Sequence, residues 1–264
     1  MLGLVRSAFL NRRILWQLIK RDLFAAHHGS VLGALWVLID PLAYIALALC
    51  FFQFAVKGGE DAGVSYVAWV LPLIVLWTFV SAAISSATAM VREYSFLLRH
   101  RNFDMRLVAW IKVSSAALVH FVLLAVVLIF LIVHSRLPVG WPMLALVYYF
   151  FAICAFITAV DWIISALGVF WKDVRGIVSI LLQVGFWISP IFWEPSRFPA
   201  PVAFVMYANP LFYPMNGYRK SIIMADFGVS FWGFTFYYWA VIGVLLYFGS
   251  RLFNRLSRSF GDVL

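Results

Sequence analysis

Residues 188–216 read ISPIFWEPSRFPAPVAFVMYANPLFYPMN, a composition that suits neither a surface loop nor one straight helix. Six of the chain's 10 prolines fall in this stretch. Seven aromatic residues share it, namely Phe192, Trp193, Phe198, Phe204, Tyr207, Phe212 and Tyr213. Because proline breaks the interior of a helix, the stretch is expected to form short pieces of structure in an apolar environment.

The rest of the chain is equally apolar, since 65% of its 264 residues are hydrophobic and only 12% are charged. Soluble domains are nearer half apolar and a quarter charged. The composition therefore predicts an all-α polytopic membrane protein, with one membrane domain over residues 1–264. Cys50 and Cys154 lie in apolar stretches and are expected to be small buried side chains rather than a disulfide.

Six segments are apolar over roughly the 20 residues that a membrane-spanning helix needs, the fifth only marginally. They cover approximately 31–56, 64–91, 113–133, 141–171, 176–193 and 227–250. Fifteen of the 20 lysines and arginines fall on one side of these spans. The positive-inside rule makes that side cytoplasmic, and both termini lie on it. This placement argues against binding of nucleic acid and favours contact with anionic membrane lipids.

The opening stretch then lies between the fifth and sixth spans, on the outer side. Within the region 194–226, two short helices that dip into the membrane and turn back are expected near 201–207 and 214–225. Asn209-Pro210 would make the turn between them. The alternative is an interfacial loop whose aromatic residues lie at the level of the lipid headgroups.

Two cytoplasmic segments have helical patterns. Residues 11–24, within a cytoplasmic arm over 1–30, predict an amphipathic helix that lies in the membrane interface. Residues 92–112 mix apolar and basic side chains in a compact helical segment. This segment is either a simple connector between two spans or a docking surface for a soluble partner.

The chain lacks the usual motifs of catalysis. It contains no GxxxxGK[ST] phosphate loop, no HExxH, no GxSxG and no cluster with metal-ligand spacing, so no cofactor or metal is expected in this chain. His120 is expected to pack rather than to ligate. Asp40 and Asp161 lie within spans, where each is either a proton site or a residue that packs beside a neighbouring helix.

Four stretches together resemble a known family. They are RDLFAAHHGSVLGALWVLIDPL (21–42), LPLIVLWTFVS (71–81), KDVRGIVSILLQVGFWISPIFW (172–193) and YANPLFYPMNGYRKSII (207–223). In order and spacing they resemble permease subunits of ABC type-2 polysaccharide exporters, which move capsular polysaccharide, O-antigen or teichoic acid. His27-His28 stand where the family often has Arg-Tyr, and Asp104–Arg106 lacks the prolines that the family often has in this loop. These departures weaken assignment to the O-antigen branch, and the short cytoplasmic termini favour a capsule-type permease.

The resemblance implies a bacterial inner-membrane fold of six spans, with two short re-entrant helices before the last. It also implies that two copies of the chain form a channel and that two separate ATP-binding subunits, which hold ATP and Mg²⁺, dock beneath it. Export proteins of the periplasm and outer membrane are further candidate partners. The segment 92–112 corresponds to the coupling helix, and its expected ATPase contacts are Leu97, Leu98, Arg99, Arg101, Phe103 and Arg106.

A sugar chain needs a wide path whose aromatic faces meet sugar C–H groups. The candidate path residues are Trp36, Tyr44, Phe51, Phe52, Trp187, Phe192 and Trp193. The charges expected at the outer mouth are Glu194, Arg197, Arg219 and Lys220. Because aromatic residues make up 19% of the chain, the alternative is that many of these rings merely face lipid or the core.

Three other functions stay open at this point. They are export of a different lipid-linked substrate such as teichoic acid, a membrane enzyme that acts on lipid-linked sugars, and a proton-coupled carrier that uses Asp161. An enzyme should gather ionisable residues at one membrane face, which this sequence does not do. A carrier should work without an ATPase partner.

Overall fold

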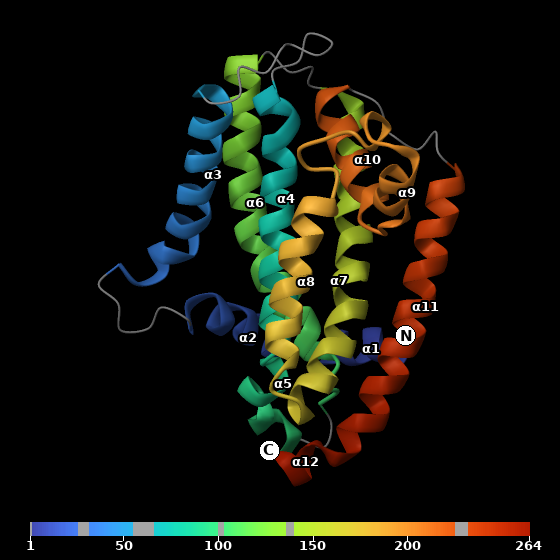
Figure 1. Ribbon diagram of the computed structural model, residues 1–264. Coiled ribbons are helices and arrows are strands. Elements are labelled where there is room, and N and C mark those ends of the chain that lie inside the picture. The colour runs from blue at the N-terminus through green and yellow to red at the C-terminus, as the bar shows by residue number, and fades with distance from the viewer. Residues whose placement is uncertain (1, 26–31, 55–65, 100–102, 136–139, 225–231) are drawn as a thin grey trace.

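The computed structural model describes residues 2–25, 32–54, 66–99, 103–135, 140–224 and 232–264, and the regular elements within them are all helices (Figure 1). Four of these helices are long and apolar enough to cross a membrane. They are α4 (Tyr66–Ala87), α6 (Leu107–Ser135), α7 (Ala145–Phe170) and α11 (Trp232–Leu256). The expectation of an all-α polytopic membrane protein is confirmed at this level.

Two shorter apolar helices occupy the first and fifth predicted spans. They are α3 (Trp36–Phe54), which begins after the 3₁₀ turn η1 (Gly33–Leu35), and α8 (Val174–Ile188). With 15 residues, α8 is about 22 Å long, less than the ~30 Å hydrocarbon core of a bilayer. It ends before the predicted limit because Ser189 has extended backbone angles and a proline follows it.

α7 is the centre of the bundle, and it packs against α4, α6, α10 and α11 (Figure 1). Glycine allows two of these close approaches. A Cβ atom at Gly249 of α11 would lie 2.8 Å from the carbonyl oxygen of Ala159, and one at Gly168 would lie 2.6 Å from that of Thr88. Small residues let membrane helices approach backbone to backbone, where dispersion forces hold them together.

Two short helices form in the region of the proline-rich stretch 188–216, as predicted. After the turn η4 (Pro195–Arg197) come α9 (Ala200–Ala208) and α10 (Phe212–Ile223). The predicted turn at Asn209-Pro210 separates them. The side-chain oxygen of Asn209 accepts a hydrogen bond from the backbone N–H of Leu211 (3.0 Å), and its amide donates to the Ser189 hydroxyl (3.2 Å). One asparagine thus fastens the turn to the end of α8.

Arg219 of α10 holds the irregular backbone that follows α8. Its side chain is only 1% exposed. The guanidinium donates hydrogen bonds to the carbonyl oxygens of Pro190, Ile191 (2.8 Å) and Trp69 (3.3 Å), and its central carbon lies 4.0 Å from the ring centroid of Trp69. The next carbonyl, that of Phe192, accepts a hydrogen bond from the Tyr66 hydroxyl (2.9 Å).

This placement corrects one sequence-based expectation. Arg219 was expected among the charges of an outer mouth, but it lies inside the fold. The physical reason is that the carbonyls between α8 and η4 have no helical partners, and buried carbonyls need donors. A planar guanidinium with five N–H groups can serve several of them at once.

Short helices gather at the opposite end of the bundle, here called the basal end (Figure 1). They are α1 (Leu2–Leu10), α2 (Arg12–Ala25), α5 (Met90–Glu93), η2 (Ser95–Arg99), η5 (Ser257–Ser259) and α12 (Phe260–Val263). α2 is the predicted amphipathic helix, whereas α1 was not predicted. α6 begins six residues earlier than the predicted span. Leu4, Leu18, Tyr94 and Phe260 belong to a second hydrophobic core at this end, separate from the core of the bundle.

The role of Arg219 can be tested by substitution. Arg219→Met should keep much of the side-chain volume but leave the non-helical carbonyls of Pro190 and Ile191 without their donor. Each unsatisfied buried group costs about 1–3 kcal/mol, so the variant should be several kcal/mol less stable. The measurement is the midpoint of thermal unfolding of the purified protein in detergent.

The matched control is Lys220→Met, which removes a cation from the neighbouring position of α10. It should unfold within a few degrees of the wild type. Equal unfolding midpoints for the two variants would show that Arg219 does not stabilise the non-helical backbone after α8.

Candidate functional site

Three residues at helical spacing on α3 face the bundle. Trp36, Asp40 and Tyr44 recur every four residues and therefore lie on one face of the helix. Each of them lines a cavity between α3 and its neighbours. α3 leans away from the other helices at its lower end (Figure 1).

The first cavity, of about 340 Å³, lies between α3, α4 and α8. Its lining combines aromatic and polar side chains and consists of Tyr44, Trp77, Thr78, Ser81, Leu182, Gln183 and Phe186. Four of these side chains, those of Tyr44, Thr78, Ser81 and Gln183, carry a hydroxyl or a carboxamide, which can exchange hydrogen bonds with sugar hydroxyls. The rings of Trp77 and Phe186 lie 5.8 Å apart and form its apolar floor.

The second cavity, of about 370 Å³, adjoins the first and extends toward the basal end. Both are lined by Thr78. Its polar lining comes from four helices and comprises Asp22, Asp40, Thr78, Ser86, Lys112, Ser115 and His120, with Trp36 as its large aromatic face. The two adjoining cavities together form one trough. It combines aromatic faces with hydroxyls and carboxylates, which is the chemistry that recognises carbohydrate.

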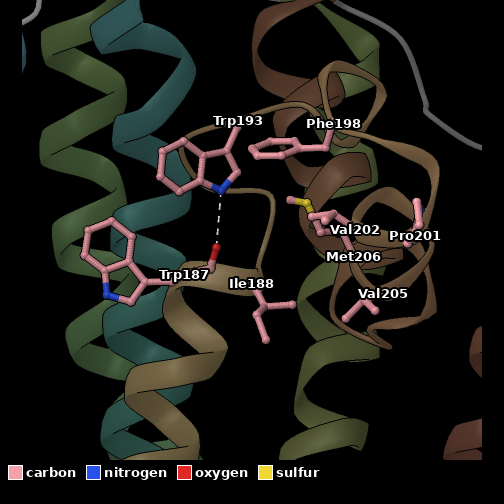
Figure 2. Close-up of a pocket in the computed structure, with 8 residues that line it drawn as sticks. All are labelled: Trp187, Ile188, Trp193, Phe198, Pro201, Val202, Val205 and Met206. Carbon is pink, nitrogen blue, oxygen red and sulfur yellow. Dashed lines mark hydrogen bonds between the residues drawn. The ribbon is translucent and has the colours of Figure 1, made fainter.

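A third cavity, of about 550 Å³, lies beyond the end of α8 and is almost wholly apolar (Figure 2). Its lining is Trp187, Ile188, Trp193, Phe198, Pro201, Val202, Val205 and Met206. The indole N–H of Trp193 donates to the carbonyl oxygen of Trp187 (3.2 Å), and the two rings stack with centroids 6.0 Å apart. Figure 2 shows both indoles on the α8 side of this cavity and the α9 side chains opposite them.

The structure separates the predicted path residues into three groups. Trp36, Tyr44, Trp187 and Trp193 line cavities. Phe51 is 58% exposed, and the side chain of Phe52 lies outside the described residues. Phe192 is only 9% exposed, and its ring meets that of Phe186 edge-on at 5.1 Å, so it supports the aromatic cluster from within the core.

The opposite wall of the trough was not predicted from the sequence. On α4 it is formed by Trp77, Thr78, Ser81 and Ser86, and on α8 by Gln183. The available signal was the recurrence of hydroxyl residues every three to five positions along an otherwise apolar span. Of the other predicted outer charges, Glu194 and Arg197 are exposed and Lys220 is half-buried.

The predicted coupling segment is partly folded into the basal core. Leu97 is only 4% exposed and packs in that core, so it is not presented to a partner as expected. The physical reason is that the turn, in which the Leu97 N–H bonds to the Tyr94 carbonyl oxygen (2.9 Å), leaves this apolar side chain in the basal core, away from water. Leu98 and Phe103 are half-buried, and Arg106 forms a 2.6 Å ion pair with Asp104. Arg101 and the side chain of Arg99 lie outside the described residues.

An ionic cluster, in which Lys112 and Asp22 are mostly buried and Glu93 is half-exposed, joins this segment to α2 and α6. The Lys112 ammonium lies 2.6 Å from carboxylate oxygens of both Asp22 and Glu93. Asp22 also accepts hydrogen bonds from the hydroxyls of Ser115 (2.5 Å) and Tyr94 (3.0 Å). Burial and the nearby Asp22 carboxylate raise the pKa of the Tyr94 hydroxyl above its ordinary value, so this hydroxyl remains a donor.

The other ionisable groups within the helices do not form a catalytic arrangement. His120 is buried, and its ring nitrogens contact the Tyr218 hydroxyl (3.0 Å) and the Val75 carbonyl oxygen (3.3 Å), so it packs as predicted. The carboxylate of Asp161 is 0% exposed, and neither oxygen has a hydrogen-bond partner among the described residues. Within the same described ranges, no group of three or more His, Cys, Asp or Glu residues could hold a metal ion.

Most of the chain matches one known protein family. Residues 13–223 match the family described as ABC-2 type transporter. The chain belongs to the ABC-2 type transporter family. The resemblance on the four sequence stretches is thereby confirmed, and the protein is a membrane permease subunit rather than an enzyme.

Full-length relatives carry related names. One is the O-antigen export system permease protein RfbA of Klebsiella pneumoniae, 20% identical over 93% of this chain and 92% of the relative. Another is the O-antigen export system permease protein RfbA of Myxococcus xanthus, 24% identical over 83% of this chain and 84% of the relative. These relatives are named for export of O-antigen, whereas the sequence departures weakened assignment to the O-antigen branch.

The ionic cluster around Lys112 is expected to stabilise the folded state of this ABC-2 permease. Lys112→Met removes the shared cation and leaves the mostly buried Asp22 carboxylate without a counter-charge. Breaking such a pair costs about 3–5 kcal/mol, and the midpoint of thermal unfolding should fall accordingly.

The double variant Lys112→Met/Asp22→Asn removes both charges and should recover much of the loss. If the double variant is as unstable as the sum of the single variants, the two groups do not interact in the folded protein.

Proposed function

We propose that the chain is the channel-forming permease of an ATP-driven exporter that moves a lipid-linked bacterial polysaccharide across the inner membrane. The observation that carries this proposal is the trough, where a stripe of Trp36, Asp40 and Tyr44 faces the hydroxyl residues of α4. A long polar chain slides most easily over many weak contacts of this kind, because no single site holds it tightly.

The substrate class follows from the trough and from the relatives together. Aromatic rings and hydroxyl groups suit a glycan, and the relatives are named for export of O-antigen. An O-antigen-type glycan is therefore favoured over the capsular glycan that the short termini suggested. Teichoic acid remains the alternative within the same class of lipid-linked polymers.

The proposed topology uses all six apolar helices. α3 and α8 complete the six spans, both termini lie in the cytoplasm, and α9 and α10 form a re-entrant region at the outer face. The basic residues support this orientation, because fifteen of 20 lie on the basal side of the spans. The apolar cavity beside Trp187 and Trp193 then lies at the outer end of the path.

The proposed assembly contains two copies of this chain and two ATP-binding subunits. The trough is open on one side, and a second copy would complete a continuous path by presenting the same face. The ATPase would contact the basal end through Leu98, Phe103 and α2, and Lys112 would transmit its movement to α6 and the trough. ATP and Mg²⁺ belong to that partner, and periplasmic export proteins would receive the glycan.

The aromatic residues at the end of α8 provide the test. The double variant Trp187→Ala/Trp193→Ala removes ring surface from the outer cavity and only one hydrogen bond, that of the Trp193 indole. Export should fall by about tenfold, since each lost aromatic contact is worth about 0.5–1.5 kcal/mol. The measurement is surface polysaccharide per unit of membrane-inserted complex, with ATP hydrolysis recorded alongside.

The matched control is Trp232→Ala/Phe236→Ala, which removes two strongly exposed rings from α11, away from the trough. Its export should equal that of the wild type. If both double variants export equally, the aromatic cluster only anchors the protein in the membrane, and the proposed path is wrong.

A further inference from the structure

A fourth cavity, of about 650 Å³, shares no lining residue with the trough. It is a groove between α2, α6, α7 and α11. Its walls are mainly apolar, with Val113, Ala117 and Phe121 from α6, and Phe150 and Ala155 from α7. The ring of Phe121 is half-exposed at its rim, so the groove opens to the side of the bundle rather than into its core.

The length of the groove matches one leaflet of a bilayer. Along α6 its lining runs from Trp110 to Phe121, a rise of about 16 Å at 1.5 Å per residue. Half of the ~30 Å hydrocarbon core is about 15 Å. The groove therefore reaches from the basal surface to roughly the middle of the membrane, which is the depth of a single acyl chain.

The basal mouth of the groove carries cations. Trp16 and Ile19 of α2 line the groove at this end. The Lys20 ammonium lies over the Trp16 ring, 5.2 Å from its centroid. Arg13 is exposed and three residues before Trp16, so it lies on the same face of α2. Two cations thus flank an aromatic ring at the position where a lipid phosphate would lie above its acyl chain.

We propose that this groove binds an anionic phospholipid of the cytoplasmic leaflet, with one acyl chain between α6 and α7 and the phosphate beside Lys20 and Arg13. The tryptophan lies at the headgroup level, as interfacial aromatic residues do. The lipid would tie the amphipathic helix α2 to the membrane-spanning helices next to the ionic cluster around Asp22. The inference rests on the membrane orientation given under the proposed function, but not on export itself.

The test uses the full-length protein purified into nanodiscs of phosphatidylethanolamine and phosphatidylglycerol at three to one, followed by native mass spectrometry. The wild type should retain phosphatidylglycerol in preference to phosphatidylethanolamine. Arg13→Ala/Lys20→Ala should reduce this retention by at least about tenfold, because each cation near an anionic surface contributes about fivefold. Ala155→Phe should reduce it by filling the groove.

Two variants serve as controls. Arg21→Ala removes a cation of α2 whose guanidinium lies over Phe96 instead, and Ile180→Phe enlarges an exposed residue of α8. Both should retain lipid like the wild type. Because neither ATPase nor glycan is present, a failure here would leave the export function standing, and a loss of export would leave lipid retention unaffected.

Three outcomes would overturn the proposal. The first is equal retention in the groove variants and the controls. The second is retention of a polyprenyl phosphate in place of a phospholipid, which would make the groove a site for a lipid carrier. The third is a change from dimer to monomer in Ala155→Phe with unchanged lipid, which would make it an interface between copies.

Discussion

The fold depends on one constraint, which is that backbone groups inside a membrane must find hydrogen-bond partners within the protein. Helices satisfy this constraint by themselves, but the chain between α8 and α10 does not continue a helix. Arg219 supplies missing donors from α10 to two carbonyl oxygens of this segment, those of Pro190 and Ile191, and Tyr66 supplies a donor to a third, that of Phe192. A single buried cation therefore permits the break that turns the chain at Pro190.

That break in turn shapes the candidate path. Because α8 stops at Ile188, its last residues present Trp187 beside Trp193 rather than extending as a smooth apolar helix. The same short helix leaves Gln183 facing the hydroxyl residues of α4 across from Tyr44. The outer aromatic cavity is thus a consequence of one helix end, which is held in place by a guanidinium on α10, and the same helix contributes one wall to the first cavity of the trough.

Much of the fold could be predicted from sequence, because hydrophobic length and proline position are local signals. The helices α4, α6, α7 and α11, the amphipathic α2 and the turn at Asn209-Pro210 all follow from such signals. The burial of Arg219 could not be predicted, since it depends on carbonyls that lie 28 and 29 residues away. For the same reason Leu97 was expected at a docking surface, although tertiary packing against the basal core decides its position.

Of the candidate site, the α3 side was predicted from its aromatic residues. The α4 side was missed because single serines and threonines in an apolar span give no signal of their own.

The central claim is that a glycan moves along the trough, and photo-crosslinking tests it most directly. A photoreactive phenylalanine analogue at position 44 should crosslink to the exported polysaccharide in cells that export actively, and the same analogue at position 236 on the exposed side of α11 should not. Crosslinking at position 44 that depends on ATP hydrolysis is the predicted result. Equal crosslinking at the two positions, or none at position 44 while export proceeds normally, would contradict the account.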